Sequence, residues 1–130
     1  MNKKILLVGA LLGFFGVVLG AFGAHGLKGY ITDAALDTFE TGVKYQMYHA
    51  FVLLFVGIIK VFKESTKKYL FYLFLGGILL FSGSIYGLAT NELTSFFDFK
   101  KIGFVTPVGG TLLIIGWAVM GYQFMRMKTK

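Results

Sequence analysis

The fold is decided by residues 5–27, which have the sequence ILLVGALLGFFGVVLGAFGAHGL. This stretch contains no Asp, Glu, Lys or Arg, and nearly all of its side chains are apolar. A helix of about 20 apolar residues is long enough to cross the hydrocarbon core of a bilayer. We therefore predict that residues 5–27 form a transmembrane helix.

Three further stretches repeat this pattern along the chain. The predicted spans are residues 5–27, 43–62, 69–91 and 102–125, and no linker or second domain separates them. The second span is the shortest, because its apolar run passes Lys60 only if that side chain reaches the membrane surface with its charged end. The 130 residues thus predict a single domain, an all-α membrane protein whose four transmembrane helices form a compact bundle.

The composition excludes an ordinary soluble enzyme. Hydrophobic residues make up 56% of the chain and charged residues 15%, and the mean hydropathy is +0.74, so too few polar side chains are present to cover a soluble surface. The absence of cysteine excludes disulfides, thiolate metal sites and cysteine catalysis. We find no motif of a serine hydrolase, a phosphate-binding loop or a zinc protease, and we expect no enzyme activity, cofactor or metal.

The charged residues predict the orientation in the membrane. Nine of the 13 basic residues lie at the end that holds both termini and the middle connection: Lys3, Lys4, Lys60, Lys63, Lys67, Lys68, Arg126, Lys128 and Lys130. The opposite end holds five of the six acidic residues: Asp33, Asp37, Glu40, Glu92 and Asp98. The positive-inside rule then places both termini in the cytoplasm. This distribution explains the +7 net charge without nucleic acid, and the basic loop is suited to anionic lipid.

An alternative interpretation makes the first stretch a signal peptide. Lys3 and Lys4 precede the apolar run, and Ala21-Phe22-Gly23 resembles a cleavage site. However, the apolar run continues to Leu27, and removing the stretch would leave three spans and spoil the charge asymmetry. We therefore expect the segment to remain as the first span.

A regular row of glycines marks one face of the first span. Its members follow one another at alternating steps of four and three residues: Gly9, Gly13, Gly16, Gly20 and Gly23. Glycine allows helices to approach closely in lipid, where the hydrophobic effect does not drive them together. We expect this glycine row to pack either against another helix of the chain or against a second copy in a homo-oligomer, and the sequence leaves both open.

The connection before the second span predicts a short amphipathic helix. Thr32 is a suitable N-cap. The acidic residues from Asp33 onward fall on one helical stripe, and Leu36 and Phe39 fall on a neighbouring stripe. Such a helix would lie in the membrane interface and lead into the second span, with a bend at Gly42.

Polar side chains gather in the outer half of the predicted bundle: His25, Tyr45, Gln46, Tyr48, His49, Ser82, Ser84, Tyr86, Thr90, Thr106 and Thr111. The inner halves of the first two spans contain none, whereas Trp117 and other aromatic residues of the inner side fit an interfacial belt. Unpaired polar groups are costly in hydrocarbon, so we expect the outer ones to face one another, a cavity or water.

Two histidines of this cluster are candidate ligands. Tyr45 and His49 share one face of the second helix, and His25 lies at a similar predicted depth on the first. Together with Glu40, the histidines would offer three metal ligands, relay a proton or bind an anion. The spacing matches no known metal motif, however, and we expect no bound metal. The simpler interpretation is that both imidazoles hydrogen-bond helix ends, tyrosines or lipid headgroups.

Several segments resemble a known family: residues 20–27 (GAFGAHGL), 39–50 (FETGVKYQMYHA), 82–86 (SGSIY) and 106–110 (TPVGG), with Trp117. Over nearly its whole length the chain resembles the small bacterial inner-membrane proteins catalogued as domain of unknown function 423, and it is similar to a short animal transmembrane protein of the same family. The resemblance implies four transmembrane helices and no particular reaction.

We predict a non-enzymatic component of the bacterial plasma membrane that binds a lipid headgroup, a small ligand or a partner helix at the outer polar cluster. The predicted ligand-binding residues, all within the family's motifs, are His25, Glu40, Tyr45, Tyr48, His49, Ser82 and Ser84. Expected partners are membrane lipids, a second copy or another membrane protein, and not nucleic acid. The alternative is an oligomeric transporter or channel for a proton, ion or small solute, although the apolar inner half disfavours a pore through one chain.

Overall fold

The computed structural model describes residues 2–128, which form four long α-helices joined by short connections. The helices are α1 (Asn2–His25), α2 (Asp33–Ile58), α3 (Glu64–Ala89) and α4 (Val105–Arg126). Two 3-10 helices, η1 (Asn91–Leu93) and η2 (Phe99–Ile102), lie between α3 and α4. The predicted all-α fold is confirmed.

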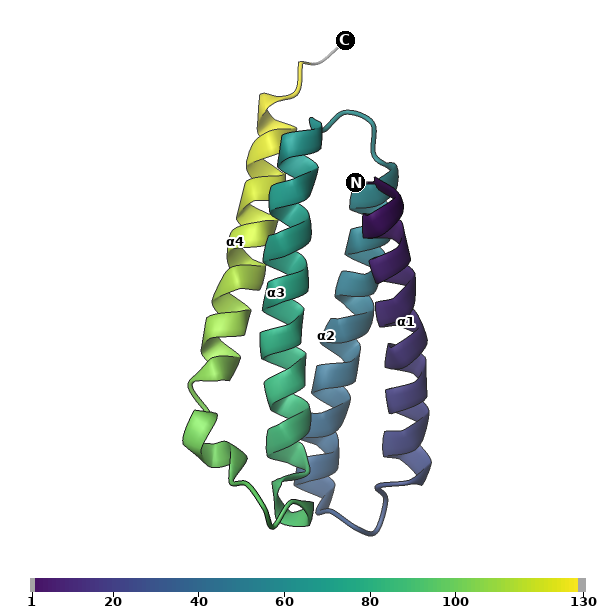
Figure 1. Cartoon of the computed structure of the whole chain (residues 1–130), viewed down its shortest axis with the longest axis vertical. Helices are drawn as coiled ribbons and strands as arrows, with labels where there is room; N and C mark the ends of the chain where they lie inside the picture. The colour runs from purple at the N-terminus through teal and green to yellow at the C-terminus, as the bar shows by residue number, and fades with distance from the viewer. Residues whose placement is uncertain (1, 129–130) are drawn as a thin grey trace.

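The four helices stand side by side in chain order and alternate in direction (Figure 1). Extensive packing joins α1 to α2, α2 to α3 and α3 to α4, while α1 and α4 lie at opposite edges (Figure 1). The start of α1, the α2–α3 connection and the end of α4 share one end of the bundle, as the sequence predicts. We name this the basic end, after its lysines and Arg126. The acidic end holds the other two connections.

The start of α2 follows the predicted pattern. The Thr32 hydroxyl accepts a hydrogen bond of 3.1 Å from the Ala35 N–H, which caps the helix. The helix then continues without interruption through Gly42 to its end. The predicted short amphipathic helix is therefore the first part of α2 and not a separate element. Gly42 serves close packing, since a Cβ atom there would lie 2.7 Å from the ring of Tyr86 in α3.

The glycine row of α1 packs against α2 of the same chain. A Cβ atom on Gly9 would lie 3.2 Å from the carbonyl oxygen of Ala50, and one on Gly23 would lie 2.9 Å from the ring of Phe39. The missing side chains thus let α1 approach α2 along most of its length. Of the two interpretations that the sequence leaves open for this row, packing within the chain is the one observed.

The apolar core lies toward the basic end and contains side chains of all four helices: Ile5, Leu53, Val56, Phe62, Leu70, Phe71, Phe74, Ile78, Leu113 and Met120. A smaller apolar cluster, formed by Leu27, Phe39 and Ala89, lies toward the acidic end. Between these clusters α2 carries the buried polar residues Gln46 and His49. The polar region that the sequence predicts therefore lies between the two apolar clusters.

Three segments of the described chain are long and apolar enough to cross a membrane: Asn2–His25, Glu64–Ala89 and Phe99–Arg126. α2 is not among them, since polar residues such as Gln46 and His49 lower its hydropathy. These two side chains are only 5% and 3% exposed, so the bundle and not the lipid surrounds them. With 26 residues, α2 is as long as α3. A span at residues 43–62 stays a prediction, and its last four residues lie beyond the end of α2, in the connection to α3.

Candidate binding site

The structure separates the two histidines. His25 ends α1 and is exposed at the acidic end, where Glu40 is exposed as well. His49 is buried. At the helical rise per residue, it lies about 24 Å along α2 from the helix start at the acidic end. The two histidines lie at different depths because α2 begins at Asp33, a full ten residues before the predicted span. Within residues 2–128, no group of three or more His, Cys, Asp or Glu side chains is placed to hold a metal ion.

His49 is held in the bundle through both of its ring nitrogens. Its Nδ1 lies 2.7 Å from the carbonyl oxygen of Tyr45, one turn earlier in α2. Its Nε2 accepts a hydrogen bond of 3.1 Å from the Trp117 indole N–H in α4. A carbonyl can only accept and an indole can only donate, so the imidazole is neutral and carries its proton on Nδ1. His49 therefore ties α2 to α4 and has no free ring nitrogen.

A groove of about 270 Å³ lies beside this histidine, between α2 and α4. Its lining residues are Tyr45, His49, Phe81, Gly110, Leu113, Ile114 and Trp117. The Tyr45 ring stacks on His49 with their centroids 6.5 Å apart, and it packs edge to face on Phe81 with the centroids 5.0 Å apart. No Asp, Glu, Lys or Arg side chain lines the groove, so its walls are aromatic and aliphatic.

Gln46 joins three helices at the middle of the bundle. Its Nε2 donates a hydrogen bond of 2.8 Å to the Leu12 carbonyl oxygen of α1, and its Oε1 accepts one of 2.6 Å from the Tyr86 hydroxyl of α3. Gly16 of α1 lies beside this contact, and a Cβ atom there would press on the Met47 sulfur of α2. A buried amide is thus satisfied within the protein, as an apolar surrounding requires.

Two serines make similar links between helices. The Ser82 hydroxyl of α3 donates a hydrogen bond of 2.7 Å to the Gly42 carbonyl oxygen of α2. The Ser84 hydroxyl lies 2.6 Å from the Thr106 hydroxyl of α4. The buried polar groups therefore face one another, as predicted from the sequence.

The predicted ligand-binding residues divide into two sets. His49, Ser82 and Ser84 are buried and hydrogen-bonded: they hold helices together. His25, Glu40, Tyr45 and Tyr48 are exposed. The rings of the two tyrosines pack edge to face with centroids 5.7 Å apart. A ligand-binding role for the seven residues as one cluster stays a prediction.

The sequence does not predict the hydrogen-bond partners of these buried polar side chains. Trp117, expected in an interfacial belt, is the hydrogen-bond partner of His49. The sequence places Gln46 and Tyr86 among the polar residues of the outer half, but it does not predict the hydrogen bond between them. The sequence held a usable signal, because a polar residue expected inside the bundle needs a partner at the same depth on a neighbouring helix.

Comparison with known proteins gives consistent results. A family model described as "Protein of unknown function (DUF423)" matches residues 19–110. A UPF0382 membrane protein of Staphylococcus aureus is 40% identical over 91% of this chain and 92% of its own length. A UPF0382 membrane protein of Haemophilus influenzae is 40% identical over 99% of both chains. The UPF0382 membrane protein YwdK of Bacillus subtilis is 38% identical over 91% of this chain and 93% of its own. No solved structure matches the chain.

Proposed function

Because the chain belongs to the DUF423 family of membrane proteins, whose function is unknown, we propose from its geometry that it is a non-enzymatic protein that binds a lipid hydrocarbon chain. The proposed site is the groove between α2 and α4. The observation that carries the proposal is that the groove has apolar walls while the ring nitrogens that line it are already hydrogen-bonded within the protein. Such a site offers shape and apolar contact, and its imidazole has no free nitrogen to act as an acid or a base.

The pairing inside the groove limits the chemistry of the ligand. The imidazole of His49 and the indole N–H of Trp117 use their hydrogen-bonding capacity on the protein. Of the lining side chains, only the Tyr45 hydroxyl lacks a hydrogen-bond partner within residues 2–128. A ligand therefore meets at most one free side-chain donor, and burying a charged or strongly polar group there would cost its hydration without compensation.

The size of the groove limits the occupant to one chain. Its volume of about 270 Å³ is below the ~300–1,000 Å³ of typical pockets for drug-sized ligands. Part of one acyl or isoprenoid chain fits this space, whereas a whole lipid does not. Between lipid and protein there is little hydrophobic driving force, so affinity has to come from close contact with the walls. Binding would therefore select chains by shape.

We further propose that the protein lies in the bacterial plasma membrane with both termini in the cytoplasm. Its bacterial relatives are named as membrane proteins, which supports a membrane location. The orientation is supported by the excess of Lys and Arg at the basic end, since such residues favour the cytoplasmic side.

Quenching of tryptophan fluorescence tests the groove, because Trp117 is the only tryptophan of the chain and lines it. The full chain is placed in phosphatidylcholine vesicles that contain increasing fractions of phosphatidylcholine brominated on the acyl chains. Bromine quenches an indole on contact. We expect Ile114→Phe, which narrows the groove, to reduce the quenching of Trp117 relative to the unsubstituted protein.

A matched control comes from the neighbouring residue. Ile115 is an exposed isoleucine of α4 that does not line the groove. The substitution Ile115→Phe adds the same bulk and is expected to leave the quenching unchanged. Gly110→Leu fills the groove from a second position and should act as Ile114→Phe does. Equal quenching in the groove and control variants would show that Trp117 meets only bulk lipid, and would contradict the proposal.

A further inference from the structure

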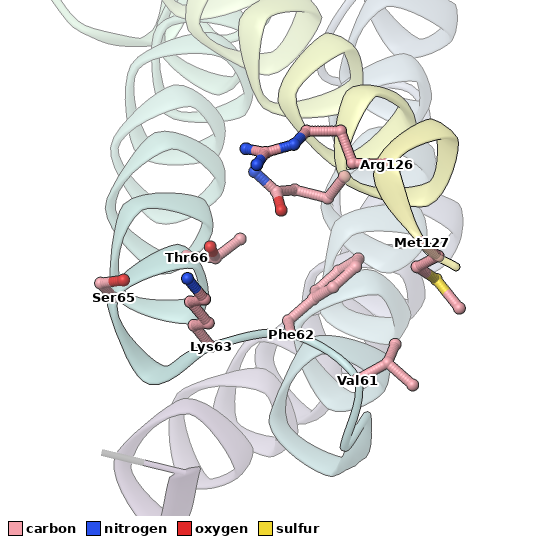
Figure 2. A pocket seen from close by; sticks show the side chains of 8 residues that line it. Val61, Phe62, Lys63, Ser65, Thr66, Arg126 and Met127 are labelled. Carbon is pink, nitrogen blue, oxygen red and sulfur yellow. The ribbon is translucent and has the colours of Figure 1, made fainter.

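A second pocket, separate from the groove, lies at the basic end. It has a volume of about 340 Å³ and is lined by Val61, Phe62, Lys63, Ser65, Thr66, Gln123, Arg126 and Met127. Figure 2 shows Lys63 and Thr66 at the start of α3 and Arg126 at the end of α4 extending into the space between the two helices. Unlike the groove, this pocket is lined largely by polar and basic side chains, so it suits a different kind of ligand.

The pocket is lined by two basic side chains, Lys63 and Arg126, and by no acidic side chain of residues 2–128. The adjacent carboxylate of Glu64 accepts a hydrogen bond of 3.5 Å from the Asn2 side chain and so engages α1, not α4. The Arg126 guanidinium lies 5.7 Å from the centroid of the Tyr122 ring, a contact that positions it without neutralising it. An anion is the complementary ligand.

The backbone adds further donors at the same place. Lys63 is the N-cap of α3, and its side chain makes no capping hydrogen bond. The first bond from the helix goes from the Lys67 N–H to the Lys63 carbonyl oxygen, so the N–H groups of the preceding residues have no acceptor within the helix. The Ser65 and Thr66 hydroxyls line the pocket beside them. Lysine and arginine side chains with hydroxyl and N–H donors form a suitable set of contacts for phosphate.

We propose that this pocket binds one phosphate group, either that of an anionic phospholipid headgroup or inorganic phosphate. The inference does not depend on the proposed function of the groove, which lies toward the other end of α4 and has no charged lining. The exposed apolar side chains of Val61 and Met127 border the basic side chains and give lipid chains a surface beside the headgroup.

Native mass spectrometry of the full chain in detergent micelles, titrated with phosphatidylglycerol, tests this site. We expect one saturable lipid adduct. The double substitution Lys63→Ala with Arg126→Ala should weaken the adduct by about tenfold, since both charge-assisted contacts are lost. The matched control is Lys60→Ala with Lys68→Ala, which removes the same charge from exposed positions of the same end that do not line the pocket. This control should retain the adduct.

Competition with millimolar inorganic phosphate distinguishes the two sources of the phosphate group. A lipid adduct that survives added phosphate identifies the headgroup as the ligand. A lipid adduct that added phosphate displaces identifies inorganic phosphate as the ligand. This displacement should disappear in the Lys63/Arg126 variant. Equal weakening in both double variants would mean that the charge of the whole basic end attracts the lipid, and would overturn the proposal. The absence of a saturable adduct with either phosphatidylglycerol or inorganic phosphate in the unsubstituted protein would overturn it as well.

Discussion

Gln46 shows at the scale of one residue how the bundle accommodates a polar side chain among apolar helices. Its amide uses one hydrogen bond on the α1 backbone and one on the Tyr86 hydroxyl, and the side chain is 5% exposed. Leaving a buried polar group without a partner costs more than making the bond gains. Gln46 and Tyr86 should therefore depend on each other.

A double-mutant cycle tests this dependence. Gln46→Leu leaves the Tyr86 hydroxyl without its acceptor, and we expect the free energy of unfolding in bicelles to fall by about 1–3 kcal/mol. Adding Tyr86→Phe removes the unpaired hydroxyl, so the double variant should lose less stability than the sum of the two single variants. Gln123→Leu serves as control, because that side chain has no hydrogen-bond partner among the described residues. Additive losses from Gln46→Leu and Tyr86→Phe would contradict this coupling.

The sequence predicts that these polar residues face the inside of the bundle, but neither their depth nor their partners. Helical periodicity places Gln46 and His49 in the bundle, and the cost of burying polar groups requires that they be paired. Which group pairs with which depends on the rotation of each helix and on its neighbours. His25 and His49 looked like a pair in the sequence, whereas His49 is bonded to Trp117 and His25 is exposed.

At the scale of the helix, glycine decides how closely two elements approach. The tightest case is Gly109 of α4, where a Cβ atom would lie 2.8 Å from the Gly77 carbonyl oxygen and press on the Phe81 backbone nitrogen. Backbone atoms cannot move aside as a flexible side chain does. The contact between α3 and α4 therefore requires glycine at this position.

Substitutions at two neighbouring glycines test this requirement. We expect Gly109→Ala to lower the free energy of unfolding by about 1–3 kcal/mol, the usual cost of overpacking. Gly110→Ala is the matched control, because its Cβ atom would lie 3.4 Å from the Phe81 ring in ordinary contact. Gly110→Ala should not lower the free energy of unfolding. Thermal unfolding of the two variants in one detergent compares their stabilities. Equal losses would show that α3 and α4 separate easily and that Gly109 is not essential for their packing.

The connection between α3 and α4 owes its shape to Asp98. Its carboxylate accepts hydrogen bonds from the Lys100 N–H at 3.1 Å and from the Asn91 side chain at 3.0 Å. The Lys100 N–H and then the Asn91 amide hold the pKa of Asp98 below its usual value, because both bonds favour the ionised form. The stabilisation is complete above the pKa of a free Asp side chain and is lost as the pH falls through the lowered value in the folded protein.

Hydrogen exchange tests this pH dependence. We expect protection of the Lys100 amide, relative to its intrinsic exchange rate, to be constant at neutral pH and to decline below about pH 4. Asp98→Asn should reduce protection at neutral pH and remove the decline. Asp37→Asn is the control, since the Asp37 carboxylate accepts no hydrogen bond from a described residue. A pH profile that persists in Asp98→Asn would assign the effect to another group.

The sequence predicts the helices better than their connections. Thr32 marks the start of α2 because its capping geometry is local. The last helix begins at Val105 and not at the predicted residue 102, because the 3-10 helix η2 precedes it. That short element depends on the Asp98 and Asn91 contacts. Such contacts join residues across a loop and leave no periodic pattern in the sequence.

At the scale of the whole molecule, α1 lies at one edge of the bundle and packs mainly against α2 (Figure 1). α1 and α4 lie at opposite edges (Figure 1), and the glycine row of α1 is already occupied by α2. A seam of this kind looks the same in a sequence whether it serves one chain or two, and in this chain the structure shows α2 packed against it. Large apolar side chains of α1 such as Phe14 and Val17 remain exposed, as expected for a surface that faces lipid.

Lipid binding in the groove is the central claim, and mapping the contacts of a photoreactive lipid tests it most directly. The full chain in vesicles would be illuminated with phosphatidylcholine that carries a diazirine on an acyl chain, and the adducts located by mass spectrometry of peptides. The comparison is between groove residues and the lipid-facing surface of α1. Leu113 in the groove is 5% exposed, whereas Phe14 and Val17 are 61% and 63% exposed.

A chain that occupies the groove reaches residues that bulk lipid does not. We predict that adducts concentrate on Phe81 and Leu113, at yields well above their share of the exposed surface. Adducts that simply follow exposure, dense on Phe14 and Val17 and absent from Leu113, would contradict it: the groove would then be a packing feature of the bundle and not a binding site.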